Sequence, residues 1–314
     1  MMKLRITALT LCLSLVLGMA LPCAFAEDDG APKLKSAQCA LLGDMGSGRI
    51  LFNIDAYSRR EPASLTKIMT LLLAVEAIEA GTASLDDTVT ASAACKTGLE
   101  HDRGETMSLR DLLYCAALAS ANEACNIIAE HISGSISAFV ERMNTRAAEL
   151  GCSGTHFANT HGMPDDNHYT TARDIFLIAC EGMRHRLFAQ LVGCREYTTS
   201  ATNDSPARVL ESSNALITPD SPYSDKYVYP GAVGIKTGYT EKAGYCLVSA
   251  VQRDGVNVIA VVLGADGDAA AKEFEWTRNL AVQQGVQMPK VLARHLIQSF
   301  DIGEVTPEEA HEVG

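Results

Sequence analysis

The chain has 314 residues, 47% of them apolar, which is enough for a globular protein with a substantial core. Its formal charge is −12 at pH 7 and its pI is about 5.1, and its lysines and arginines form no cluster. This charge pattern argues against nucleic acid or an anionic membrane surface as a partner.

Residues 1–26 have the features of an export signal. Lys3 and Arg5 precede an apolar stretch at residues 6–21, and residues 24–26 (AFA) form an A-x-A cleavage site. An uncleaved membrane anchor is the alternative, because the stretch is slightly long for a signal and short for a span. Either interpretation predicts an extracytoplasmic protein, secreted or held at the outer face of the cytoplasmic membrane or the cell wall.

Cleavage would leave eight of the ten cysteines, an even number that could indicate disulfides in an exported protein. However, Cys115, Cys125, Cys180 and Cys246 lie on the apolar side of predicted helices or strands. Free cysteine behaves as a small apolar residue there, so we expect mostly free thiols.

The predicted elements indicate an α+β fold. Two strands joined by a glycine-rich turn come first, and a helix at residues 64–80 follows, apolar around most of its circumference and ended by Gly81. The first two strands are at 36–42 and 49–54, and the remaining predicted elements are helices at 108–117, 123–132, 136–150, 171–183 and 269–284 and strands at 231–237, 244–252 and 256–264. Strands at both ends of a helical middle predict one antiparallel sheet built from the two ends. An acidic, solvated tail is expected at residues 286–314.

The long helix opens with Ser64-Leu65-Thr66-Lys67, the chain's one S-x-x-K. Residues three apart share a helix face, and burial lowers the pKa of a lysine until its neutral amine can accept a proton. Ser64 and Lys67 can therefore act as a nucleophile beside a base. The alternative is that Lys67 extends to water and Ser64 only caps the helix.

Two further motifs each occur twice. Ser120-Ala121-Asn122 lies in a loop between helices, which can present polar groups to a cleft, and a second S-x-N at residues 212–214 lacks this position. Lys236-Thr237-Gly238 ends an extended stretch, whereas the copy at residues 96–98 lies in a polar loop without a strand. On a strand edge, Gly238 would leave room for an extended peptide, while the lysine and threonine would face a carboxylate.

The order Ser-x-x-Lys, Ser-x-Asn, Lys-Thr-Gly is typical of penicillin-interacting serine enzymes. With these motifs the chain resembles the serine-type D-alanyl-D-alanine carboxypeptidases, the low-molecular-mass penicillin-binding proteins. Further matching segments are residues 112–124, 157–164 (FANTHGMP), 168–174 (HYTTARD) and 236–248 (KTGYTEKAGYCLV). The resemblance implies a serine β-lactamase/transpeptidase-like fold, a five-stranded antiparallel sheet packed with a helical region. It suggests a catalytic domain at residues 27–285.

The resemblance also implies residue roles. Ser64 would attack the carbonyl between the last two D-alanines of a cell-wall stem peptide, Lys67 would take its proton, and Ser120 would pass a proton to the leaving amine. Substrate would be bound by Asn122, Lys236, Thr237, Gly238 and Tyr239. The backbone N–H groups of Ser64 and Tyr239 would form the oxyanion hole, and the charge of Lys236 would keep Lys67 neutral.

The implied partners are peptidoglycan stem peptides and, as covalent inhibitors, β-lactam antibiotics. No cofactor, metal or nucleic acid is implied, and a monomer is expected. The implied biological roles are cell-wall biogenesis and cell shape, and endopeptidase or transpeptidase side activity stays open.

The chain departs from the family pattern at one point. An arginine usually follows the last strand to bind the substrate carboxylate, but residues 264–271 contain none, and Lys272 is the candidate substitute. The E-x-x-L-N loop of class A β-lactamases is also missing, and the surroundings of Asp165 and Asp166 match the carboxypeptidase pattern. The sequence therefore predicts a long-lived penicilloyl adduct.

Two alternatives come from other classes of protein. His161, Asp165, Asp166 and His168 are close in sequence and could bind a metal, but their spacing fits no ligand pair on a helix face. They are expected to stabilise a loop instead. The other alternative is a non-catalytic binding protein with this fold, against which the intact motifs argue.

Overall fold

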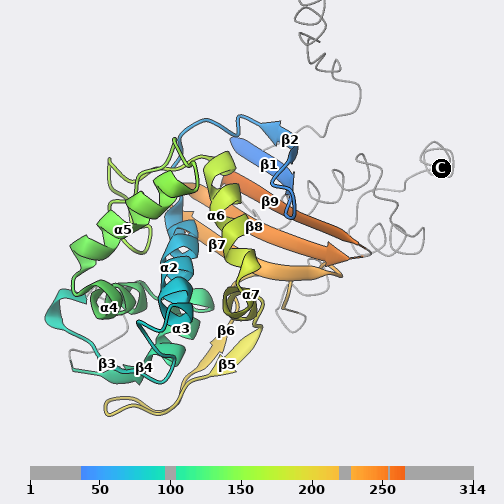
Figure 1. Ribbon diagram of the computed structural model, residues 1–314. Coiled ribbons are helices and arrows are strands. Elements are labelled where there is room, and N and C mark those ends of the chain that lie inside the picture. Colours follow the sequence, from blue (N-terminus) through green and yellow to red (C-terminus); the bar gives the residue numbers. More distant parts are fainter. Residues whose placement is uncertain (1–36, 96–103, 219–227, 254, 266–314) are drawn as a thin grey trace, which may run out of the picture. The chain divides into compact units, whose positions relative to one another are not determined.

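The computed structural model describes residues 37–95, 104–218, 228–253 and 255–265 (Figure 1). The predicted export signal, the final helix at 269–284, the acidic tail, Lys272 and the Lys-Thr-Gly copy at residues 96–98 lie outside the described residues.

One five-stranded antiparallel sheet joins both ends of the described chain, in the order β2-β1-β9-β8-β7. Its strands are β1 (Cys39–Asp44), β2 (Ile50–Ile54), β7 (Ala232–Thr240), β8 (Gly244–Arg253) and β9 (Val256–Ala265). The sheet confirms the α+β prediction, and β7 forms one edge of it.

The apolar runs of the central strands are explained by burial on both faces of the sheet. Along β9, Val261 belongs to the large core shared with the helices, while its neighbour Val262 belongs to a second cluster on the opposite face. Leu216 and Tyr229, from the segment before β7, pack into this second cluster. Alternate residues of one strand therefore fill two cores, since successive side chains point to opposite faces.

The helices surround α2 (Lys67–Glu79), which contacts each of the other α-helices and lies among them in Figure 1. These are α3 (Leu109–Ala117), α4 (Asn122–Ser133), α5 (Ile136–Glu149), α6 (Ala172–Arg184) and α7 (Arg186–Val192). Helix α6 packs on β1 and β9, and α7 packs on β7. Residues 67–75 of α2 are all buried, as its apolar circumference predicted.

The boundaries differ from prediction at two places that matter for the site. Ser64 lies in a 3-10 turn, η1 (Ala63–Thr66), and α2 begins only at Lys67. Ala63 has φ +47°, so a regular helix cannot extend back through it. Strand β7 continues to Thr240, so Lys236-Thr237-Gly238 lies inside the strand and does not end it.

Several short elements were not predicted. They are helix α7, the 3-10 turn η2 (Ala93–Cys95), and two small hairpins, β3 (Thr88–Thr90) with β4 (Thr106–Ser108) and β5 (Glu196–Thr198) with β6 (Val209–Glu211). Strands of three residues are too short for a clear alternation of apolar and polar positions.

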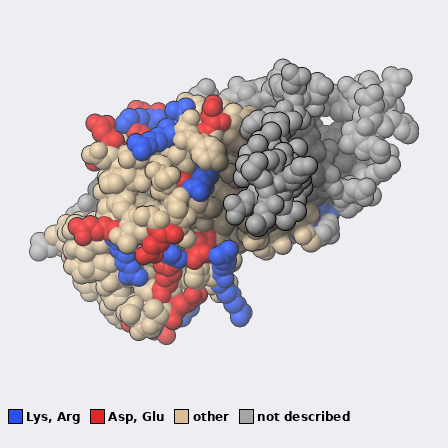
Figure 2. Space-filling view, turned by 45° about the horizontal axis from the view of Figure 1, so that its top comes forward, with Lys and Arg blue, Asp and Glu red and all other residues tan. Residues whose placement is uncertain are grey.

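The cysteines and charges follow ordinary patterns. All eight cysteines of the described ranges are free thiols, and Cys115, Cys125, Cys180 and Cys246 are buried as expected. On the face shown in Figure 2, acidic and basic side chains are interspersed among large uncharged areas. Within the described segments, no helix combines the length and apolar composition needed to cross a bilayer.

Candidate active site

Ser64 lies on a tightly held turn between Pro62 and α2. The preceding Ala63 adopts φ +47°, a conformation that costs a non-glycine residue about 1–3 kcal/mol and persists only where the surroundings enforce it. Two glycines enclose the turn. A Cβ on Gly238 of β7 would lie 2.9 Å from the Ser64 nitrogen, and one on Gly162 would overlap the Ala63 carbonyl oxygen. Only glycine permits both close approaches.

Lys67 is fully buried beneath Ser64, which is itself partly exposed. The Lys67 Nζ lies 3.0 Å from Ser64 Oγ, 2.8 Å from Asn122 Oδ1 and 2.8 Å from the His161 carbonyl oxygen. A neutral amine can donate to the last two groups and accept a proton from the serine hydroxyl. The alternative, that Lys67 extends to water, is therefore wrong for this structure.

Ser120 and Asn122 flank the start of α4. Ser120 has φ +58°, and its Oγ is buried without a hydrogen-bond partner among the described residues. An unsatisfied buried hydroxyl costs about 1–3 kcal/mol, so this one is available to a bound molecule. Asn122 is the first residue of α4 and not a loop residue as predicted. Its side-chain oxygen already accepts a hydrogen bond from Lys67.

Strand β7 brings the third motif against the nucleophile turn, because η1 packs on β7. Lys236 is 1% exposed, and its Nζ donates to the Thr237 carbonyl oxygen at 3.1 Å. Thr237 is partly exposed, and the side chain of Tyr239 is 53% exposed and lies beside Tyr245, with ring centroids 4.5 Å apart. Gly238 was expected to leave room for a peptide, but its closest neighbours are the atoms of the nucleophile turn.

Burial governs the charges of both lysines. Desolvation lowers the pKa of Lys67, and desolvation followed by repulsion from Lys67 lowers the pKa of Lys236 to about 7. Two buried ammonium groups close together disfavour each other. The site therefore disfavours the state in which both lysines are charged.

The structure adds two residues that the sequence patterns did not predict as part of the site. The His161 carbonyl belongs to the segment at residues 157–164, and His161 was considered only as a metal ligand and not as a partner of Lys67. Ser213 belongs to the S-x-N copy that was set aside, yet its Oγ lies 2.6 Å from Thr237 Oγ1. The second occurrence of the S-x-N motif was the feature of the sequence that could have indicated a role for Ser213.

The predicted metal alternative is not supported by the geometry of its residues. His168 uses both ring nitrogens in hydrogen bonds to Thr66 and Ala158, and Asp165 Oδ1 accepts from the Asn167 backbone. Asp166 is exposed and pairs with Lys242. These residues stabilise a loop, as the sequence suggested.

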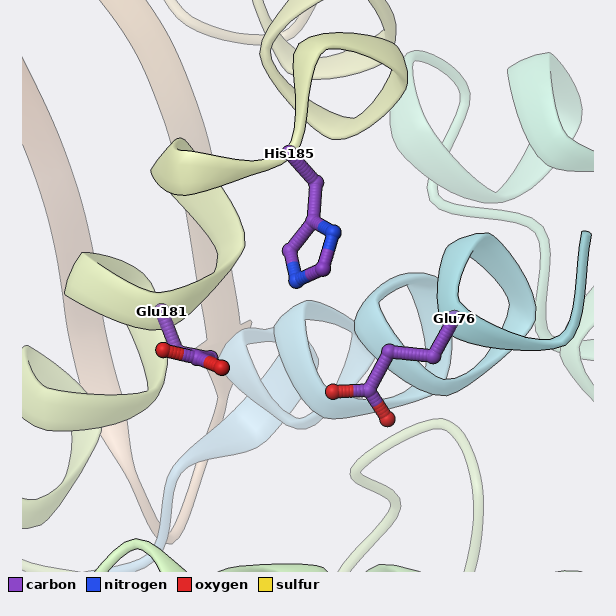
Figure 3. A group of neighbouring side chains, drawn as sticks. All are labelled: Glu76, Glu181 and His185. Carbon is purple, nitrogen blue, oxygen red and sulfur yellow. The ribbon is translucent and has the colours of Figure 1, made fainter. Parts of the chain in front are cut away.

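A different group, Glu76, Glu181 and His185, has side chains that converge in Figure 3. Arg146 pairs with both carboxylates, at 2.8 Å each, and His185 Nδ1 lies 2.7 Å from Glu79 Oε2. Since Arg146 pairs with both carboxylates and Arg184 also pairs with Glu181, we interpret the cluster as an ion-pair network joining α2, α5 and α6.

Comparison with known proteins shows which family the chain matches. Residues 27–267 match the family model described as D-alanyl-D-alanine carboxypeptidase. The chain is 36% identical to DacF of Bacillus subtilis over 82% of its length and 32% identical to DacA of Escherichia coli over 75%. It spans 65% and 57% of the length of those two proteins.

Solved structures share the fold. A Streptomyces K15 DD-transpeptidase mutant superposes with a TM-score of 0.68 at 28% identity, covering 79% of this chain and 97% of that one. Penicillin-binding protein D2 of Listeria monocytogenes, in its ampicillin-bound form, gives 0.66 at 30% identity, covering 79% and 98%. With the motifs meeting at one turn and a family match over most of its length, the chain belongs to the D-alanyl-D-alanine carboxypeptidase family of serine peptidases.

Proposed function

We propose that the chain is a serine D-alanyl-D-alanine carboxypeptidase, which removes the terminal D-alanine from peptidoglycan pentapeptides through an acyl-enzyme. The observation that carries this proposal is the contact of a fully buried lysine with a partly exposed serine, Lys67 Nζ to Ser64 Oγ at 3.0 Å. This combination supports a chemical role, because a structural lysine would be less costly to keep at the surface.

Binding of the substrate carboxylate prepares the base. The carboxylate meets the Thr237 hydroxyl near Lys236, whose pKa of about 7 leaves it partly neutral in the free protein. An anion beside Lys236 favours its charged form. Since like charges disfavour each other, a charged Lys236 would in turn favour the neutral form of Lys67, so the binding step and activation of the base would support each other.

Acylation follows from the positions of the hydroxyls. Ser64 attacks the carbonyl carbon as Lys67 takes its proton, and the backbone N–H groups of Ser64 and Tyr239 stabilise the oxyanion, each by about 3 kcal/mol. Ser120, whose Oγ is unpartnered in the described part of the chain, relays the proton that Lys67 took from Ser64 to the amine of the leaving D-alanine, which leaves Lys67 neutral again. In deacylation Lys67 takes a proton from the attacking water, and this proton returns to Ser64 Oγ as the ester bond breaks.

A β-lactam would enter the same steps, because its carboxylate and strained amide resemble the terminal dipeptide. The ampicillin-bound and cefotaxime-bound forms of the Listeria relative support this. Asp165 is tied to the loop backbone and Asp166 to Lys242, so neither is poised to activate water. We therefore expect a penicilloyl adduct on Ser64 that lasts far longer than seconds.

The biological setting belongs to the same proposal. Residues 1–26 direct export, residues 27–285 form the catalytic domain, and residues 286–314 form an acidic tail. The protein acts as a monomer outside the cytoplasm, on peptidoglycan stem peptides, and contributes to cell-wall biogenesis and cell shape.

The test uses a defined pentapeptide muropeptide with wild type and Ser64→Ala, analysed by mass spectrometry. Loss of one alanine with wild type alone is the expected result. Equal alanine release by folded Ser64→Ala, or none by folded wild type, would overturn the proposal.

A further inference from the structure

His168 is a buried histidine that the proposed reaction does not use. It is 2% exposed and lies 102 residues beyond Thr66 in the chain. Its Nε2 is 2.7 Å from Thr66 Oγ1, and its Nδ1 is 3.0 Å from the Ala158 backbone nitrogen. Its ring also packs edge-on to Phe157 at 5.8 Å between centroids.

Only one assignment of hydrogen-bond donors and acceptors is consistent with these contacts. The Ala158 N–H can only donate, so His168 Nδ1 is the acceptor and the ring proton of a neutral imidazole is on Nε2. Nε2 therefore donates to Thr66 Oγ1, and the Thr66 hydroxyl donates to the Ala63 carbonyl oxygen at 2.8 Å. The chain of hydrogen bonds ends on the residue before the nucleophile.

Ala63, on which this chain of hydrogen bonds ends, is a strained residue of the site. Ala63 has φ +47°, and the orientation of its peptide group sets the position of the Ser64 nitrogen and side chain. A threonine inside a helical turn often bonds to the carbonyl three or four residues earlier, but without a further partner the hydroxyl can exchange this bond for another by rotating. The His168 donor removes this freedom, since Thr66 Oγ1 must then use its own proton on Ala63.

The imidazole keeps this role over a wide pH range. Burial, reinforced by the nearby His161, lowers the pKa of His168 to about 4, against a smaller opposite effect of Asp165 and a further lowering by His156. The neutral tautomer, and with it the direction of the hydrogen bonds, is therefore maintained at neutral pH.

We propose that His168 is a positioning residue for the Ser64 nucleophile, acting through Thr66 and the Ala63 carbonyl. The inference rests on the proposed function, because it assigns Ser64 as the group to be positioned. With both nitrogens engaged by protein groups, His168 neither exchanges protons with substrate nor binds a metal.

A matched pair of variants tests the contacts of the two imidazole nitrogens separately. The amide nitrogen of His168→Gln can occupy the Nε2 position and donate to Thr66, whereas the amide oxygen of His168→Asn can occupy the Nδ1 position and accept from Ala158. Thr66→Val removes the hydroxyl at nearly constant volume. Each variant is measured for the second-order rate constant of acylation by a fluorescent penicillin, per titrated active site, and for melting temperature.

We expect Thr66→Val and His168→Asn to slow acylation about 10- to 100-fold, as small displacements of reacting groups do. His168→Gln should stay within about threefold of wild type, and His168→Asn/Thr66→Val should be no slower than Thr66→Val alone, because both changes break one chain of contacts.

Lower melting temperatures with an unchanged acylation constant per site would show a merely structural role and overturn the inference. Multiplicative effects in the double variant would also overturn it. Failure of folded wild type to be labelled at all would instead contradict the proposed function.

Discussion

The two ends of the site are built differently. The nucleophile end, around Ser64 and Lys67, is held by a buried network from α4, β7 and the segment at residues 158–168. The carboxylate end, at Thr237, is partly exposed, and the Thr237 hydroxyl lies 2.6 Å from Ser213 Oγ. The end proposed to form and break bonds is therefore enclosed by protein contacts, while the end proposed to admit substrate is partly exposed. Substitutions should therefore affect the rate of chemistry at the first end and substrate affinity at the second.

The largest effect is expected from Lys67→Met. It removes the base, whose contribution is about 10²- to 10⁴-fold, so acylation by penicillin should fall by that factor while the protein stays folded. Lys242→Met is the control, because Lys242 is an exposed lysine in ion pairs with Glu61 and Asp166, and exposed pairs contribute little. Equal losses in the two variants would contradict the assignment of Lys67 as the base.

A glycine pair tests how rigid the nucleophile end is. Gly162 and Gly151 both have positive φ, +97° and +75°, but only at Gly162 would a Cβ overlap the Ala63 carbonyl. Gly151→Ala should cost about 1 kcal/mol of unfolding free energy without changing acylation. Gly162→Ala should cost about 3 kcal/mol or more and slow acylation at least tenfold, as denaturant unfolding and penicillin labelling would show. Equal behaviour of both variants would mean that the close approach does not matter.

The charge of Lys236 predicts a pH dependence at the carboxylate end. Its pKa of about 7 in the free protein means that the charge is present below pH 7 and is lost as the pH rises. The kcat/KM for a carboxylate-bearing substrate should therefore fall about tenfold per pH unit above that value, since kcat/KM reports the free enzyme. The arginine of Lys236→Arg keeps its charge at every working pH. The fall of kcat/KM at alkaline pH should therefore be absent in this variant. A decline that persists in this variant would assign the titration to another group.

The smallest effect is expected from Ser213→Ala. Loss of the 2.6 Å contact to Thr237 Oγ1 should raise KM about 3- to 10-fold with little change in kcat, in line with the loss of one net hydrogen bond. The effect should appear with a peptide ending in D-Ala-D-Ala and vanish with the C-terminal amide, whereas Ser213→Thr should restore KM. A similar loss with both peptides would show that Ser213 does not act at the carboxylate.

The amino-acid sequence by itself was sufficient for the parts of the site that depend on local spacing. The three-residue separation of Ser64 and Lys67 indicated one helix face, and their contact across the 3-10 turn confirms the proximity. The apolar runs of β8 and β9 likewise predicted strands, because each run fills a core on both faces.

The contacts that tertiary structure decided are those between segments far apart in the chain. The His161 carbonyl reaches Lys67 across 94 residues, and His168 reaches Thr66 across 102. Neither pairing leaves a periodic or spaced pattern, because any loop residue can offer a backbone carbonyl and a buried histidine has no characteristic neighbours. Motif spacing therefore determined which groups could react, and the folding of distant segments around η1 decided how those groups are held.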